Sequence, residues 1–418
     1  MDIKNSPRIG KNTRALLGGL WASGPFFIIA RAATAGTQIL AARLLGPREF
    51  GLTIIISAWA GVLIIPAQLG FPQAIVKFTA MEKNPNAQAQ IISSAWWLSL
   101  SWALLVFAVL SFGQSFFSHS LRISSSLYFW ILTYAFLVLI YTLLVNSLQG
   151  LFRFKERGLT EMFYGLLTLT FFCFFYFLGE KKFASFIGAM DAGLLAASII
   201  CFFFLRSKIK LTINRDYLKP ILSYLTAPVL GAAAAAGVQY ASPLILAAYL
   251  PPQDVGLYGI YLAGSVGAAL AISYILSAIL GPLASDPEKQ SGAWRKFLFL
   301  SAPLSLAAFF VFAAGEFILL KLAGKRYPLN APWVALFSAA AVFCVLSNIA
   351  STLIAFQNAR GLWLGSLGSA LSGILCLIAN ALLIPHWKVS GAVAALILSY
   401  TASFFWCVFW RQRDPIPI

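Results

Sequence analysis

The sequence predicts an all-α integral membrane protein with twelve transmembrane helices in two parallel-repeat lobes of six. Three observations predict this fold class: an extreme apolar composition, a series of apolar segments of membrane-spanning length, and a motif that recurs half a chain later. Of the 418 residues, 60% are hydrophobic and only 10% are charged, and the mean hydropathy is +0.84. Soluble domains carry about 25% charged residues, so the composition excludes a soluble globular protein.

The apolar segments give the number of spans. About 20 apolar residues are needed to cross the hydrocarbon core of a bilayer. Twelve segments meet this requirement, and the loops between them are short. The predicted spans are residues 16–42, 50–77, 88–112, 124–148, 159–179, 183–205, 220–248, 255–283, 295–320, 332–356, 361–384 and 389–410. No soluble domain is therefore expected outside the membrane.

The basic residues give the orientation. With the N-terminus in the cytoplasm, 20 of the 30 Lys and Arg residues lie on the cytoplasmic side and 9 on the outer side. Cytoplasmic loops carry this excess in membrane proteins, so we expect both termini in the cytoplasm. The same rule accounts for the net charge of +17, and no basic face suited to nucleic acid is present outside the spans.

A repeat relates the two halves of the chain. The stretch LLGPREFGL at residues 44–52 recurs as YLPPQDVGL at residues 249–257, at an offset of 205. Two shorter matches recur at an offset of 203: RGL at residues 157–159 and 360–362, and GA at residues 188–189 and 391–392. Six predicted spans separate each pair, and since six is even, both copies have the same orientation. The repeat predicts an N-terminal lobe of residues 1–212 and a C-terminal lobe of residues 213–418.

The repeated stretch is predicted to be a corner between two helices. Its Gly and Pro suit the end of one helix and the first turn of the next, and its acid complements the new helix N-terminus. The glycine that follows, Gly51 or Gly256, permits close packing. Because Gln253 replaces Arg48 in the second copy, we interpret the stretch as a structural corner and not as a binding motif.

Several stretches carry a family resemblance. The sequence LGPREFGL after the first span, GFPQAIVKFTA at the end of the second and LQGLFRFKERGL between the fourth and fifth resemble the polysaccharide transporters. These are the O-antigen and exopolysaccharide flippases of the MOP (MATE-like) exporter superfamily. The resemblance implies two lobes around a central cavity, alternating access, and a substrate of sugars on undecaprenyl pyrophosphate. It also implies the bacterial inner membrane and polymerase or chain-length partner proteins.

Charges that occur in one lobe only are candidates for the site. Arg31 lies near the middle of the first span, where a charge is costly and usually faces a cavity. Thr34 and Gln38 follow on the same helical face, and Arg suits phosphate through its fork of donors. Lys77, at the end of the second span, and Gln239, in the seventh, complete the predicted substrate-binding set. A structural Arg31 and a Lys77 that reaches the lipid headgroups are the alternatives.

Two further groups of charges are candidates. Asp191 is predicted to be the only one of the 13 acids well inside a span. It is a candidate for ion coupling or for a charge pair with Arg31 or another cation. Arg153, Lys155 and Arg157 are predicted to line the cytoplasmic entrance, where they attract a diphosphate or simply follow the distribution of loop charge.

The function predicted from these residues is a flippase for lipid-linked oligosaccharide. The alternatives are a multidrug or ion antiporter of the same fold, a lipid II flippase, and a membrane polymerase of lipid-linked glycans. An enzyme is not expected, because no large outer loop or acid pair is present, and no ATP-binding GxxxxGK[ST] motif occurs. The five cysteines and two histidines are dispersed, so neither a metal nor a cofactor is predicted.

Overall fold

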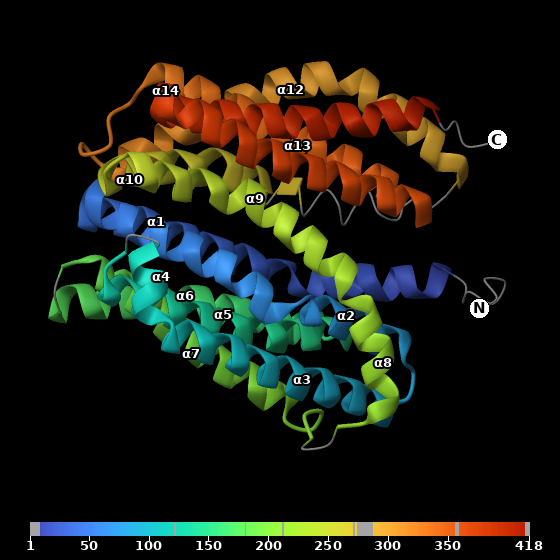
Figure 1. Ribbon diagram of the computed structural model, residues 1–418. Helices are drawn as coiled ribbons and strands as arrows, with labels where there is room; N and C mark the ends of the chain where they lie inside the picture. Colours follow the sequence, from blue (N-terminus) through green and yellow to red (C-terminus); the bar gives the residue numbers. More distant parts are fainter. Residues whose placement is uncertain are drawn as a thin grey trace. The chain divides into compact units, whose positions relative to one another are not determined.

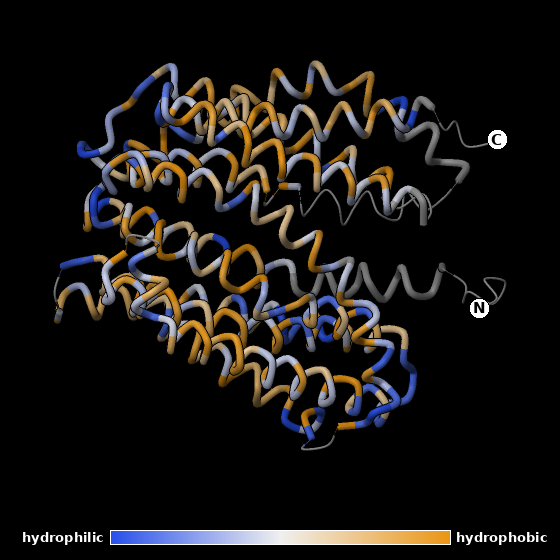
Figure 2. The backbone as a smooth tube through the Cα atoms, viewed as in Figure 1, coloured by the Kyte–Doolittle hydropathy of each residue, from blue (hydrophilic) through white to orange (hydrophobic). Residues whose placement is uncertain are grey.

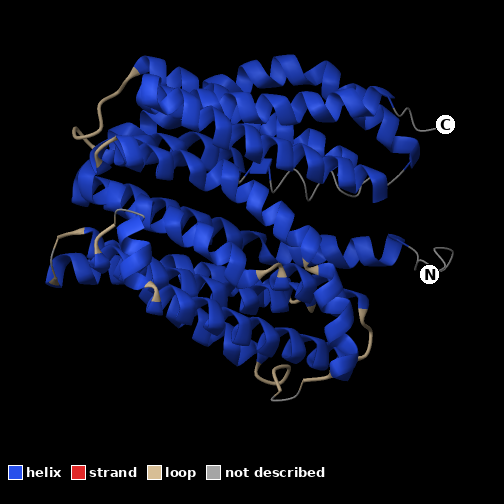
Figure 3. Cartoon of the chain, viewed as in Figure 1, coloured by secondary structure: helices blue, strands red, loops and turns tan. Residues whose placement is uncertain are grey.

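The computed structural model describes residues 9–120, 123–179, 181–210, 213–270, 272–273, 287–355 and 359–413. Within these ranges all regular structure is helical (Figures 1 and 3). Residues 271 and 274–283 of the predicted eighth span, and residues 1–8 at the N-terminus, lie outside the described residues.

The described helices are long and apolar. They are α1 (Ile9–Gln68), α2 (Phe71–Met81), α3 (Pro85–Phe112), α4 (Gln114–Ser120), α5 (Ser125–Gly150), α6 (Phe154–Leu178), α7 (Phe183–Leu205), α8 (Arg215–Tyr224), α9 (Thr226–Tyr249), α10 (Pro252–Leu262), the π-helix η2 (Ala263–Gly267), α12 (Pro287–Ala323), α13 (Ala331–Ala355) and α14 (Ala359–Arg413). Among the described residues, nine helices have the length and hydropathy to cross a membrane. Apolar residues run along the helices, and hydrophilic residues gather in the loops at their ends (Figure 2).

Large apolar side chains are exposed on these helices. Phe112 is 94% exposed, Phe299 is 80% exposed, and Phe177 and Leu178 are each 73% exposed. A monomeric soluble protein rarely exposes such contiguous apolar surface, whereas lipid chains solvate it. The chain is a multi-pass membrane protein, as the sequence predicts.

Two of the helices contain an interruption. α1 has non-helical dihedral angles at Gly46, where φ is +81°, and α14 has them at Lys388, where φ is +52°. Gly46 is the glycine of the predicted corner, so the sequence located this bend. The predicted second span, residues 50–77, is wrong in its continuity. Leu69 and Gly70 adopt positive φ angles there, and they separate α1 from α2.

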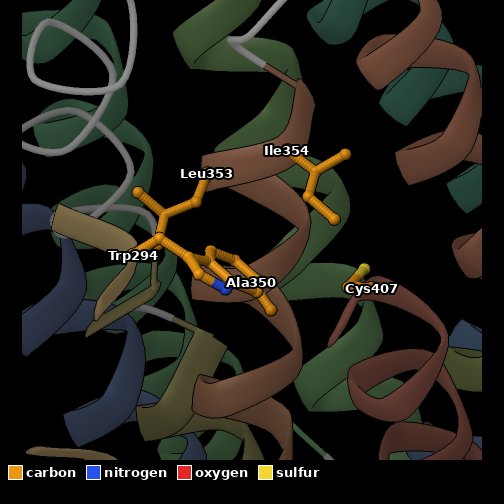
Figure 4. Packing of buried hydrophobic residues seen from close by; sticks show 5 residues of the cluster. All are labelled: Trp294, Ala350, Leu353, Ile354 and Cys407. Atoms are coloured by element: carbon orange, nitrogen blue, oxygen red, sulfur yellow. The ribbon is translucent and has the colours of Figure 1, made fainter. Parts of the chain in front are cut away.

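The chain divides into two compact units. The first comprises residues 1–38 and 63–229, and the second comprises residues 39–62 and 230–418. In the first unit α6 packs against α7, and α5 packs against both α7 and α2. In the second unit α13 lies beside α12 and α14 (Figure 1). There, Trp294, Ala350, Leu353, Ile354 and Cys407 form a buried cluster (Figure 4).

The two copies of the repeated corner pack on each other within the second unit. A β-carbon on Gly51 would overlap the carbonyl oxygen of Pro252, and a β-carbon on Gly256 would overlap that of Pro47. The backbones therefore touch reciprocally, and only glycine fits at either position. The prediction that the corner glycine permits close packing is confirmed. The repeat alone does not predict that each corner is the partner of the other.

Candidate substrate-binding site

Arg31 takes part in a charged cluster of the first unit. One of its terminal guanidinium nitrogens lies 3.8 Å from Oε2 of Glu161, which α6 supplies. The other oxygen of Glu161 accepts a hydrogen bond from Nε of Arg157, one helical turn earlier, at 3.2 Å. Arg157 also donates to the amide oxygen of Gln149 and lies 5.8 Å from the ring centroid of Phe27. Two arginines thus share one carboxylate, and the cluster keeps a net positive charge.

Exposure distinguishes the two arginines. The side chain of Arg31 is 68% exposed, whereas that of Arg157 is 25% exposed and that of Glu161 is 15% exposed. Arg157 is held by three partners, Glu161, Gln149 and Phe27, while the described ion-pair contact of Arg31 is a single one at 3.8 Å. Arg31 is therefore the cation that an incoming anion reaches with the least rearrangement.

The other four residues of the predicted substrate-binding set have different surroundings. The hydroxyl of Thr34 donates to the carbonyl of Ala30 at 2.9 Å, which is a bond within α1. Gln38 is half-buried on the same helix. Gln239 is exposed on α9 and belongs to the second unit. Lys77 lies on α2 with its ammonium 3.9 Å from the ring centroid of Tyr224, so it makes a cation–π contact with α8.

The three predicted entrance residues have different surroundings. Arg153 donates to Glu156 at 2.8 and 3.0 Å and to the carbonyl of Phe204 at 2.7 Å, so it ties the start of α6 to the end of α7. Lys155 is exposed at the start of α6. Arg157 belongs to the cluster around Glu161. The structure therefore joins Arg31 and Arg157 and gives Arg153 a structural role.

Asp191 is a buried acid on α7. The residue is 8% exposed, and neither carboxylate oxygen has a hydrogen-bond partner among the described residues. The described contact of Arg31 is with Glu161, not with Asp191. A buried, unpaired carboxylate is costly when ionised, which makes Asp191 a candidate for binding a proton or a cation. No cluster of three or more His, Cys, Asp or Glu residues suited to a metal occurs in the described ranges.

Known proteins share both sequence and fold features with this chain. The family model described as "Polysaccharide biosynthesis protein" matches residues 26–288, more than half of the chain. The chain belongs to the polysaccharide biosynthesis protein family. The predicted resemblance to polysaccharide transporters is confirmed at this level. A search of curated proteins finds no match.

Solved structures share the fold of this family member. The lipid II flippase MurJ in an inward closed conformation matches with a TM-score of 0.66 and 13% identity, over 93% of this chain and 87% of that chain. A MATE protein in complex with MaL6 matches with a TM-score of 0.61 and 13% identity, over 96% of each chain. An inward-facing multidrug resistance MATE transporter of the MOP superfamily matches with a TM-score of 0.59 and 13% identity, over 94% of this chain and 96% of that chain. The fold is therefore MATE- and MurJ-like.

Two acids of the described chain, Glu161 and Glu316, are absent from the site predicted from the sequence. Glu161 follows Arg157 by four residues, a spacing that favours an ion pair on a helix. The ion pair between these two residues could therefore have been predicted from the sequence. Glu316 lies inside the long apolar helix α12 and is 0% exposed. The prediction that Asp191 is the only acid well inside a span is therefore wrong. The run FAAGEFILL contains the signal, a single acid among apolar residues.

Proposed function

We propose that this protein is a secondary transporter that flips undecaprenyl-pyrophosphate-linked oligosaccharide across the bacterial inner membrane by alternating access. The cargo would be an O-antigen, capsule or exopolysaccharide unit. The observation that carries the proposal is the cluster of Arg31, Glu161 and Arg157, a cationic group on apolar helices with one arginine exposed. Membership of the polysaccharide biosynthesis protein family supports it.

We propose twelve spans in two lobes, residues 1–212 and 213–418, with both termini in the cytoplasm. Two of the nine candidate helices support the count, since the candidate spans Gly24–Gln68 and Trp363–Arg411 contain 45 and 49 residues. At 1.5 Å per residue they are about 70 Å long, roughly twice the thickness of the hydrocarbon core. Each is interrupted near its middle, at Gly46 and at Lys388, where a second crossing would begin.

The cluster suggests how the diphosphate is handled. A pyrophosphate loses its hydration when it leaves water, and a fixed cation compensates for that loss. Glu161 holds Arg157 at 3.2 Å and Arg31 at 3.8 Å, so the carboxylate stays with Arg157 when Arg31 turns to the phosphate. Arg157, which also donates to Gln149, then holds Glu161 in place. The carboxylate thus orients the empty site without competing strongly for Arg31.

The test is flipping of labelled substrate in proteoliposomes. The full chain is reconstituted with fluorescent undecaprenyl-pyrophosphate-linked oligosaccharide, and a membrane-impermeant reductant quenches the label on the outer leaflet. Arg31→Ala should slow flipping about 10- to 150-fold, since a charge-assisted hydrogen bond contributes about 1.5–3 kcal/mol. Arg31→Lys keeps the charge but loses the fork, so its rate should lie between.

The control for Arg31 is Arg48→Ala, which removes an exposed arginine from the repeated corner. It should flip at the normal rate. Full activity of Arg31→Ala would overturn the assignment of the cationic site. The mass of the glycan after the assay separates a flippase, which leaves it unchanged, from a polymerase, which lengthens it.

A second candidate, a cation-coupled multidrug antiporter of the same fold, has one observation in its favour. Asp191 and Glu316 are both buried, and the carboxylate oxygens of Asp191 have no hydrogen-bond partner among the described residues. Ethidium export by everted vesicles tests it with Asp191→Asn and Glu316→Gln. Export that depends on these acids, without any flipping of lipid-linked sugar, would favour the antiporter over the flippase.

A further inference from the structure

A basic pocket lies within the second unit, between α1 and the turn that joins α12 to α13. Its volume is about 710 Å³. Four of its lining residues are basic: Arg43 from α1, Lys321 from the end of α12, and Lys325 and Arg326 from the turn. No acidic residue lines it. In the proposed orientation, with both termini in the cytoplasm, the loops after the predicted first and ninth spans put all four on the outer side of the membrane.

Two glycines bring the arginines into the pocket. Gly324 has φ of +95° and Gly46 has φ of +81°, backbone angles that side chains with a β-carbon rarely adopt. Arg43 passes over Gly324, with Cγ 3.8 Å from the position a β-carbon would occupy. Arg326 passes over Gly46, with a guanidinium nitrogen 3.0 Å from the corresponding position. Each arginine therefore lies on the glycine of the other segment.

Hydrogen bonds fix the turn that forms the pocket. The buried Tyr327 hydroxyl donates to the carbonyl of Ala42, the residue before Arg43, at 3.2 Å. Burial raises the pKa of Tyr327 well above its ordinary value, so the hydroxyl keeps the proton that it donates. Tyr261 donates to the carbonyl of Pro328 at 2.8 Å and accepts from the backbone of Asn330 at 3.0 Å. These hydrogen bonds thus hold the backbone of the turn that carries Lys325 and Arg326.

The arrangement suits a compact, multiply charged anion. Four like charges in one pocket repel each other, so a phosphoryl anion among them relieves that repulsion. Two guanidinium groups provide forked donors that match phosphate oxygens. Lys321 lies over the Phe317 ring with its ammonium 4.3 Å from the centroid, which holds its charge at the pocket wall.

We propose that this pocket is a binding site for phosphoryl groups at the outer side of the protein. The occupant is a phosphate or diphosphate, presented either by a lipid headgroup or as a free ion. The inference goes beyond the proposed function, because none of its residues belongs to the Arg31 cluster and it holds for any cargo. Loss of binding here with normal flipping, or the reverse, tells the two proposals apart.

The test uses the purified full chain in nanodiscs of neutral phosphatidylcholine, with inorganic pyrophosphate as the probe. Calorimetric titration should detect binding that Arg43→Gln with Arg326→Gln weakens at least about tenfold. Arg43→Lys with Arg326→Lys should weaken it by less, because the charge remains. The control pair Arg48→Gln with Lys181→Gln removes the same charge outside the pocket and should change binding less than twofold.

Nanodiscs with added phosphatidylglycerol separate the two sources of the anion. Competition between this lipid and pyrophosphate identifies a lipid headgroup as the occupant, and unchanged pyrophosphate binding identifies the free ion. An unchanged thermal melting temperature of each variant without ligand excludes misfolding. The proposal is overturned if neither pyrophosphate nor the anionic lipid binds, or if the control pair weakens binding as much as the pocket pair.

Discussion

Both compact units press a backbone carbonyl of one helix against a glycine of another, but only one unit has a charge beside that contact. In the first unit a β-carbon on Gly165 would lie 2.9 Å from the carbonyl oxygen of Ala30. In the second unit one on Gly373 would lie 2.5 Å from that of Ala234. Ala30 and Ala234 are 204 residues apart, within the range of the repeat offset. The two glycines are 208 residues apart, about one helical turn beyond that range, so both copies retain the contact between the helices and not the identical glycine position.

The residue that follows the contact differs. Arg31 follows Ala30, whereas Ala235 follows Ala234. Arg157 has an equivalent in Arg360, but the position of Glu161, at the same offset of 203, holds Leu364. Asp191 corresponds to Ala394 in the same way. The two copies of the repeat therefore share helix packing but differ in the charged residues inside the spans. We expect the substrate-binding residues to belong to one copy only.

The largest expected effect is at the corner glycines that the repeat shares. Gly51→Ala and Gly256→Ala each force two backbones apart, because the new β-carbon overlaps a carbonyl oxygen. Overpacking costs about 1–3 kcal/mol and occasionally more, and we expect a loss of at least about 3 kcal/mol here. Thermal melting in detergent and the yield of folded protein measure it.

The control for the corner is Gly36→Ala in α1, where nothing lies within 4 Å of the new β-carbon. This substitution should be neutral or stabilising, by about 0.5–1 kcal/mol. The corner contact is reciprocal, so Gly51→Ala and Gly256→Ala should be equally damaging. A clear difference between them would mean that the two corners are not equivalent partners.

The next effect concerns the asymmetry of charge. Arg31→Ala combined with Ala235→Arg moves the cation to the equivalent position of the second unit, where the side chain is also exposed. Flipping should stay about 10- to 150-fold below normal, because the second unit has Arg360 and Leu364 at the positions equivalent to Arg157 and Glu161, and so lacks the equivalent carboxylate. Recovery of the normal rate in the proteoliposome assay would show that only the number of cations matters.

A smaller effect on stability is expected at Gly165 and Gly373, the two glycines that contact Ala30 and Ala234. Gly373→Ala should lower stability by about 1–3 kcal/mol, because Ala234 offers its Cα at 2.9 Å as well as its carbonyl oxygen at 2.5 Å. Gly165→Ala should cost less, since the new methyl group meets the Ala30 oxygen at 2.9 Å and the Ala33 β-carbon at 3.2 Å. Melting temperatures of the two variants should follow this order. Gly231→Ala, in open space on α9, is the matched control.

How far the sequence predicts this molecule depends on whether a property is local. Composition and apolar length predict the helical membrane fold, and the Gly46 bend is predicted because glycine, proline and position all agree. The break at Leu69 and Gly70 was missed because Leu69 is an ordinary apolar residue within an apolar run. Contacts between distant segments, such as Arg31 with Glu161 or Arg43 with the turn around Arg326, leave no periodic signal in one sequence. Glu316 could have been noticed as a single acid in an apolar run, but it lies near the end of its predicted span, residues 295–320.

The smallest expected effect concerns how strongly Arg31 and Arg157 each interact with Glu161. Double-mutant cycles with Arg31→Gln, Arg157→Gln and Glu161→Gln measure the coupling of each arginine to the carboxylate through thermal stability. Arg31 is 68% exposed and 3.8 Å from Glu161, so their coupling should be within about 0.2–1 kcal/mol and decrease with salt. Arg157 is closer and more buried, so its coupling should be larger. Were Arg31 the more strongly coupled, Glu161 would compete with the substrate, and the idea of a carboxylate that stays with Arg157 would fail.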